Sequence, residues 1–238
     1  MRLDGMIFDL DGTLTDTFRV CFAAFREALQ PVTGRMYSDE EIMTRFGPSE
    51  EGMFQRWVPD RWEECMRRYL AAYEREHRRM ARTFPGIEAA LSLLKTRGIR
   101  LAVVTGKGPR SAAISLTQLG IAPYFDSVET GSPEGAVKPR CIQGVLERWG
   151  ALARQVAYLG DVPSDVEASR IVGVQPLAAA WDERADAAAL RARGPVEVFD
   201  TVAQFIRWIE TTVEPRPGGA RSDASSTDRH PARPDTGQ

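Results

Sequence analysis

Short apolar runs and helical patterns alternate along most of the chain. Four runs have the length and composition of buried strands, at residues 6–8, 101–104, 127–129 and 156–159, and residues 174–178 and 196–199 add two more. Between them lie helical segments at 91–97, 110–119, 139–149 and 165–172, which are followed by Gly98, Gly120, Gly150 and Gly173. Strands that alternate with helices are typical of βαβ units. The pattern predicts an α/β fold in which helices sandwich a parallel sheet.

Residues 18–82 depart from this alternation. They contain no good strand, and apolar residues recur there at helical spacing, as in Trp62, Cys65, Met66, Tyr69, Leu70 and Tyr73. Ser38 with Glu41, and Asp60 with Glu63, have the spacing of a capping box, which begins a helix. The sequence therefore predicts an all-helical insertion at residues 16–83, within a core domain made of residues 1–15 and 84–213.

The C-terminal segment, residues 214–238, has a different composition. It contains no aromatic residue and four prolines, and consists mostly of Gly, Ser, Asp, Arg and Ala. Such a segment cannot bury enough apolar area to offset its ordering entropy. We expect it to be a disordered tail.

Composition and charge exclude several classes of protein. The net charge is −2, and no basic tract stands out among the 31 basic residues, so we expect no nucleic-acid partner. No apolar stretch approaches the roughly 20 residues that span a bilayer, so we expect no membrane partner. Three widely spaced cysteines fit no metal-ligand pattern, and a cytoplasmic location is the expectation. The sequence leaves the oligomeric state open.

Polar and charged residues gather where the predicted strands end. Asp9, Asp11 and Gly12 follow the first strand, and Thr105 and Gly106 follow the second; the remaining members of this set are Lys138, Asp161 and Asp165. In an open parallel sheet, the loops at the carboxyl ends of the strands form the ligand crevice. We therefore expect these residues to meet in one site.

The residue types indicate phosphoryl chemistry. Three carboxylates in one crevice repel one another unless a cation lies among them, and hard oxygen ligands favour Mg²⁺. Asp9 is the candidate nucleophile and Asp11 the candidate general acid and base. Lys138 and Thr105 can hold phosphoryl oxygens, and backbone N–H groups near Gly12 and Gly106 can approach them closely.

Four sequence motifs, DLDGTLTD, VVTGK, VKP and YLGDVPSDVEAS, resemble those of haloacid dehalogenase superfamily hydrolases in the expected order. The resemblance extends over about residues 3–212 and implies a Rossmann-like core with a helical cap, as in the phosphoglycolate phosphatase-like branch. It implies that Asp9 is the nucleophile and that the Asp11 carbonyl also binds the metal. Thr105 and Lys138 then hold the phosphate, and Asp161 with Asp165 surrounds Mg²⁺.

Other interpretations exist for individual residues. A strand-end aspartate is often a turn former or helix cap, and Ser164 with Glu167 has the pattern of a capping box around Asp165. Lys107 fits either a substrate contact or a solvated surface position. Arg45 precedes a helix break at residues 47–48 and is a candidate ligand for a carboxylate or second phosphate of the substrate, or else a surface arginine.

The function predicted from these motifs is a Mg²⁺-dependent phosphatase for a small phosphorylated metabolite, with 2-phosphoglycolate favoured. Pyrophosphate and nucleotides are alternative substrates within the same class. A phosphomutase of the β-phosphoglucomutase type usually has a basic residue after the cap glycine, where this chain has Ser49, Glu50 and Glu51. A true dehalogenase lacks an acid at the position of Asp11, and nothing in the sequence supports a purely binding protein.

Overall fold

The computed structural model describes residues 1–216, and the predicted tail lies largely outside them. A parallel sheet of six strands forms the centre, in the order β5-β4-β1-β6-β7-β8. The strands are β1 (Gly5–Phe8), β4 (Arg100–Val104), β5 (Ser127–Glu129), β6 (Val156–Gly160), β7 (Gln175–Ala179) and β8 (Glu197–Phe199). All six predicted runs are strands, to within one residue at each end. The α/β prediction is confirmed.

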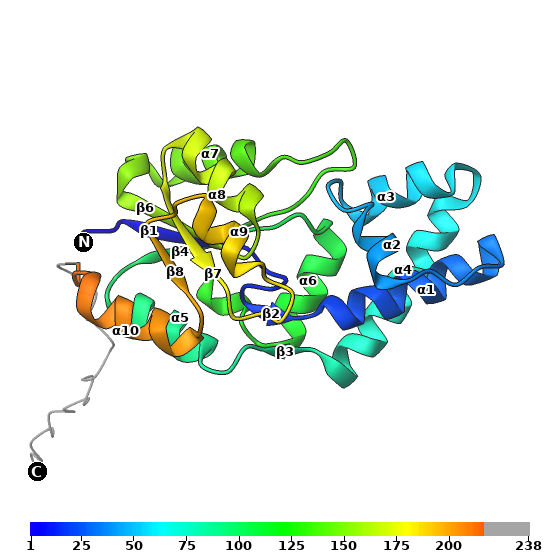
Figure 1. The fold of residues 1–238 in the computed structure, drawn as a ribbon, viewed down its shortest axis with the longest axis horizontal. Helices are drawn as coiled ribbons and strands as arrows, with labels where there is room; N and C mark the ends of the chain where they lie inside the picture. The colour runs from blue at the N-terminus through cyan, green and yellow to red at the C-terminus, as the bar shows by residue number, and fades with distance from the viewer. Residues whose placement is uncertain (217–238) are drawn as a thin grey trace, which may run out of the picture.

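Helices cover both faces of the sheet (Figure 1). On one face, α5 (Ile87–Thr96), α6 (Pro109–Gln118) and α10 (Val202–Thr212) pack on side chains such as Phe8 and Val103. On the other, α7 (Lys138–Trp149) and α8 (Pro163–Val172) pack on Ile7 and Tyr158. A short helix, α9 (Ala187–Ala192), lies between β7 and β8. Because both faces are covered, β1 is buried along its whole length, which explains its continuous apolar run.

The register of the sheet determines which strand ends meet. The central strand β1 pairs with β4 and β6, and Phe8 lies opposite both Val103 and Leu159. The residues that follow these three strands therefore emerge side by side at one edge. This edge carries the polar residues predicted after β1, β4 and β6, which begin at Asp9, Thr105 and Asp161.

The insertion is all-helical and lies at one side of the core (Figure 1). It consists of α1 (Phe18–Thr33), α2 (Asp39–Met43), α3 (Glu50–Trp57) and α4 (Trp62–Met80), which share a hydrophobic core of their own. Two short antiparallel strands, β2 (Thr15–Asp16) and β3 (Arg82–Thr83), pair where the chain enters and leaves it. We call residues 18–80 the cap.

The two predicted helix starts in the cap have different outcomes. Ser38 and Glu41 form the expected capping box at the start of α2. The prediction for Asp60 and Glu63 is wrong, because Pro59–Arg61 forms a 3₁₀ turn and α4 begins at Trp62 without a side-chain cap. Proline at the first position of that turn has a fixed φ that suits it, which accounts for the difference.

The cap contacts the core through both ends of α3. The backbone N–H of Ser49 donates to the carbonyl oxygen of Ser132 at 2.9 Å, and Arg56 donates to the carbonyl oxygen of Glu134 at 2.6 Å. A second contact joins α4 to α6, where the hydroxyls of Tyr73 and Ser115 lie 2.8 Å apart. None of the helices in residues 1–216 is long and apolar enough to cross a membrane.

Candidate active site

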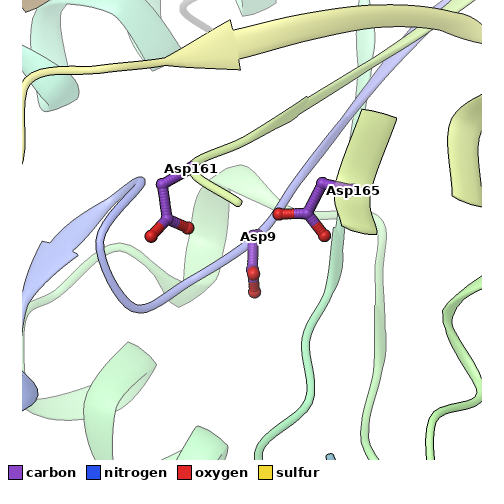
Figure 2. A group of neighbouring side chains, drawn as sticks. All are labelled: Asp9, Asp161 and Asp165. Carbon is purple, nitrogen blue, oxygen red and sulfur yellow. The ribbon is translucent and has the colours of Figure 1, made fainter. Parts of the chain in front are cut away.

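Three buried carboxylates from two distant stretches of chain converge at the carboxyl edge of the sheet (Figure 2). Asp9 follows β1, Asp161 follows β6, and Asp165 lies in the first turn of α8. One oxygen from each lies within 4.8 Å of the others. The meeting of strand ends predicted from the sequence is therefore present in the structure.

Lys138, at the start of α7, lies against two of these carboxylates. Its ammonium nitrogen is 2.5 Å from Oδ2 of Asp9 and 2.5 Å from Oδ1 of Asp165. Burial alone would lower the pKa of Lys138, but the carboxylates of Asp165 and Asp9 raise it well above its ordinary value. The lysine is therefore positively charged at neutral pH.

The single charge of Lys138 does not balance the charges of three carboxylates. Burial raises the pKa of Asp9, with Lys138 acting in the opposite direction. Burial, followed by the charges of Asp9 and Asp165, raises the pKa of Asp161 well above its ordinary value. Hydrogen bonds hold the group in place: Leu10 N–H donates to Asp9 Oδ1 at 2.7 Å, and the Thr13 hydroxyl donates to Asp161 Oδ1 at 3.2 Å.

The donor set fits a hard divalent cation. All three groups are carboxylates, which Mg²⁺ and similar ions prefer, and they are close enough for one ion to contact each. Two glycines permit this packing. A Cβ on Gly12, which has a φ of +75°, would lie 2.3 Å from Oδ2 of Asp161, and a Cβ on Gly160 would lie 2.2 Å from Oδ2 of Asp165.

Asp11 lies beside this group and is held by two partners. The hydroxyl of Thr17 donates to its Oδ1, and the ammonium nitrogen of Lys107 is 3.3 Å from its Oδ2. Burial alone would lower the pKa of Lys107, but the Asp11 carboxylate and other neighbours raise it well above its ordinary value. Asp11 therefore has a fixed orientation next to a charged lysine.

A cap residue completes this arrangement. Glu50, at the start of α3, lies 3.5 Å from the Lys107 ammonium. Its carboxylate also accepts hydrogen bonds from Gly108 N–H at 2.5 Å and from the Ser111 hydroxyl at 2.6 Å, at the start of α6. Negative charge is favourable at a helix N-terminus. Glu50 thus joins the cap to the core directly beside the site.

The interpretation of Lys107 as a solvated surface lysine is wrong, because its side chain is only 5% exposed. Sequence reasoning also gave Glu50 no role in the site. One signal was available for Lys107: it is one of three lysines in an arginine-rich chain and directly follows Thr105 and Gly106. Glu50 had no comparable signal, because its partners come from another part of the chain.

The structure places the other predicted residues in different surroundings. Thr105 is buried, and with Gly106 it lines a cavity between the cap and the carboxyl edge of the sheet. Gly12 does not line it, and its N–H donates to the carbonyl oxygen of Thr15 at 3.0 Å. Arg45 is exposed and stacks on the Trp57 ring at 4.9 Å, outside the cavity lining.

The alternative interpretation of Asp165 as part of a Ser164–Glu167 capping box does not hold. The helix α8 begins at Pro163, so Ser164 lies inside its first turn and not at the cap position. The Asp165 carboxylate does accept the Val162 N–H at 3.4 Å. It also contacts Lys138 and is fully buried, so it supports the helix start and belongs to the acidic group as well.

A cavity of about 540 Å³ lies between the cap and the carboxyl edge of the sheet. The core contributes Asp9, Asp11, Lys138 and Asp161 to its lining. The cap contributes mainly apolar side chains, including Phe25, Phe46, Met53 and Tyr69. A volume of this size suits a small-molecule ligand.

The chain is similar to several known proteins. Pyrophosphatase PpaX of Bacillus pumilus is 26% identical over 193 residues, which cover 80% of this chain and 89% of that protein. Tyrosine-protein kinase PtkA of Mycobacterium tuberculosis is 30% identical over 180 residues, 74% of this chain but only 62% of the kinase.

Solved structures show the same fold. A protein from Haemophilus somnus described as a predicted phosphoglycolate phosphatase superposes with a TM-score of 0.76 at 23% identity, over 87% of this chain and 98% of that one. The family model of haloacid dehalogenase-like hydrolases matches residues 6–179, which include all four motifs from Asp9 to Ser169. Since this match extends over most of the chain, the protein belongs to the haloacid dehalogenase-like hydrolases.

Proposed function

We propose that the chain is a Mg²⁺-dependent phosphatase that hydrolyses a small phosphomonoester through an aspartyl-phosphate on Asp9. The observation that carries the proposal is the convergence of the buried Asp9, Asp161 and Asp165 carboxylates, two of which contact the Lys138 ammonium. The family relationship and the phosphate chemistry named for the relatives support the same reaction class.

The reaction divides into two displacements. The Asp9 carboxylate attacks phosphorus, the bond from phosphorus to the ester oxygen breaks, and the alcohol leaves with a proton from Asp11. Asp11, now ionised, takes a proton from a water molecule, whose oxygen attacks phosphorus and releases inorganic phosphate and the Asp9 carboxylate. The contacts of Asp11 with Thr17 and Lys107 keep its carboxyl group oriented for both transfers.

The remaining residues hold the phosphoryl group. Lys138 has an ammonium N–H beyond the two directed at Asp9 and Asp165, and Thr105 has a buried hydroxyl on the cavity wall. Both can donate to phosphoryl oxygens and stabilise the charge that develops on them. Mg²⁺ bound by Asp9, Asp161, Asp165 and the Asp11 carbonyl would supply further positive charge to those oxygens.

The test compares matched aspartate variants. We expect the protein to hydrolyse p-nitrophenyl phosphate with Mg²⁺ and to stop when EDTA is added. Asp9→Asn should lower kcat by at least about 1,000-fold while the far-ultraviolet circular dichroism is unchanged. Asp60→Asn, at an exposed position in the cap, is the control and should retain full activity. Equal turnover by Asp9→Asn and the wild type would remove the nucleophile assignment.

A substrate panel addresses the finer alternatives. Released phosphate is measured from 2-phosphoglycolate, favoured by the motifs, and from pyrophosphate, a nucleotide and a hexose phosphate. A phosphomutase would instead interconvert hexose phosphates and release little phosphate.

A further inference from the structure

The cavity lining is rich in negative charge. Five carboxylate residues line it, Asp9, Asp11, Glu50, Asp161 and Glu167, against two lysines, Lys107 and Lys138. No arginine from residues 1–216 is part of the lining. Any second anionic group on a substrate would therefore depend on these two ammonium groups.

The Lys107 ammonium is engaged by partners from both the core and the cap. Its nitrogen donates to Cys21 Sγ at 3.2 Å and forms ion pairs with Asp11 Oδ2 at 3.3 Å and Glu50 Oε1 at 3.5 Å. The ring of Tyr73 covers it at 4.4 Å. Because Glu50 balances the charge of Lys107 even when Asp11 carries the proton for the leaving alcohol, this group offers no net positive charge to a substrate.

The Lys138 ammonium belongs to the other end of the cavity. It contacts Asp9 and Asp165 at 2.5 Å each, and the proposed function assigns its remaining N–H to the transferred phosphoryl group. The cap side of the cavity thus lacks an available cation among the described residues.

The cap side is instead lined by apolar side chains. Phe25, Met53 and Tyr69 form its inner wall and are almost completely buried. At the rim, Phe46, Val162 and Ile171 line the cavity while remaining 41%, 37% and 73% exposed. Apolar side chains that stay exposed around a cavity are typical of a binding site for an apolar group.

From these contacts we propose that the substrate is the phosphate monoester of an uncharged, predominantly apolar alcohol. This inference rests on the proposed function and specifies its substrate class. The ester and water give the free alcohol and inorganic phosphate, and the alcohol part lies against the cap during the reaction. A leaving group with a carboxylate or a second phosphate would be buried beside Glu50 and Asp11, where the single cation, Lys107, is already paired with these two residues.

The experiment uses pairs of esters that differ mainly in charge. Benzyl phosphate is compared with 4-carboxybenzyl phosphate, and isobutyl phosphate with 2-phosphoglycolate, whose carboxylate has a similar branched shape. We expect kcat/KM of the full-length protein with Mg²⁺ to be at least about tenfold higher for the uncharged member of each pair.

A matched pair of variants identifies the cause of the discrimination. Glu50→Gln keeps one oxygen that can accept from Gly108 N–H and gains an amide N–H that can donate to the Ser111 hydroxyl, but it removes the charge beside Lys107. It should reduce the preference for benzyl phosphate over its carboxylated analogue by about fivefold or more. Glu51→Gln removes the same charge at the next position, which does not line the cavity, and should leave both the preference and the activity unchanged.

The outcomes separate this inference from the proposed function. Equal or higher kcat/KM for the charged esters in the wild-type protein would overturn the inference and leave the phosphatase in place. Phosphate release from none of the esters would refute the proposed function, and the inference with it. If Glu50→Gln does not fold, the comparison of esters on the wild type decides alone.

Discussion

Gly52 lies where the cap comes closest to the core. A Cβ at this position in α3 would be 2.2 Å from the carbonyl oxygen of Pro133 and 2.7 Å from its carbonyl carbon. These are backbone atoms, which cannot rotate away as a side chain can. Gly52→Ala therefore forces α3 and the loop apart by about 1.2 Å, the difference between 2.2 Å and the 3.4 Å of ordinary contact.

This displacement acts on the contacts at the start of α3. The hydrogen bond from Ser49 N–H to Ser132, at 2.9 Å, and that from Gly108 N–H to Glu50, at 2.5 Å, lie within three residues of Gly52. A displacement of about 1 Å can lower a rate by about 100-fold. We expect kcat/KM for p-nitrophenyl phosphate to fall between about 10-fold and 100-fold. The cap should stay folded, because alanine is favoured over glycine in a helix by up to about 1 kcal/mol.

The assay pairs kinetics with thermal unfolding followed by circular dichroism. Gly144→Ala in α7 is the control, because a Cβ there meets nothing within 4 Å. The control should have wild-type activity and equal or slightly higher stability. If Gly52→Ala is folded and has wild-type kcat/KM, the contact between α3 and the core is not needed for catalysis, and the reasoning is refuted.

Two further predictions concern the carboxylate group and the cap. Gly160→Ala should lower kcat for p-nitrophenyl phosphate by about 100-fold, because its Cβ would lie 2.2 Å from Asp165 Oδ2; an unchanged kcat would contradict this. Burial lowers the pKa of His77, whose Nδ1 lies 3.0 Å from Gln118 Oε1. The unfolded chain then binds a proton near pH 6.5 that the folded chain does not, so the free energy of unfolding should fall as the pH drops below about 6.5. The free energy of unfolding, measured with urea at pH 7.5 and 5.5, should fall less for His77→Gln than for the wild type. Equal falls would contradict the role of His77.

The strands and the acidic group follow from local features of the sequence. The strands β1 and β6 are short runs that are buried along their whole length because helices cover both faces of the sheet, and Asp9 and Asp161 follow them directly. Since parallel strand ends share one edge, the convergence of Asp9 with Asp161 needed only the order of elements. Prediction was accurate for the strands and for the aspartates that follow them, but not for every helix start, because the capping box predicted at Asp60 and Glu63 is absent.

Prediction failed where a residue's role depends on how the cap meets the core. Glu50 and Lys107 are 57 positions apart in the sequence, and their proximity results from the docking of α3 on α6. The sequence leaves Arg45 open between a substrate ligand and a surface arginine, and its guanidinium stacks on Trp57 within the cap, outside the cavity lining. Sequence periodicity specifies the faces of a helix but not the position of one domain on another.

Lys107 allows the acid–base role of Asp11 to be tested without changing Asp11. Its ammonium lies 3.3 Å from Asp11 Oδ2, and Thr17 is the other partner of that carboxyl group. Without the lysine, Asp11 loses one of two contacts that orient it for proton transfer. An ester with a poor leaving group needs that proton, whereas p-nitrophenolate departs readily without it.

We therefore expect Lys107→Met to act unequally on two substrates. The kcat for benzyl phosphate should fall by about 100-fold, and that for p-nitrophenyl phosphate by less than about tenfold. Lys95→Met is the control, because Lys95 is a surface lysine paired with Asp126, and both rates should be unchanged. Equal losses on the two esters would mean that Lys107 acts on binding or on the fold. An unequal loss requires a proton donor whose position depends on this lysine. Among the residues described here, Lys107 contacts two carboxyl groups on the cavity wall, Asp11 of the core and Glu50 of the cap, and Asp11 is the one that follows β1 beside Asp9.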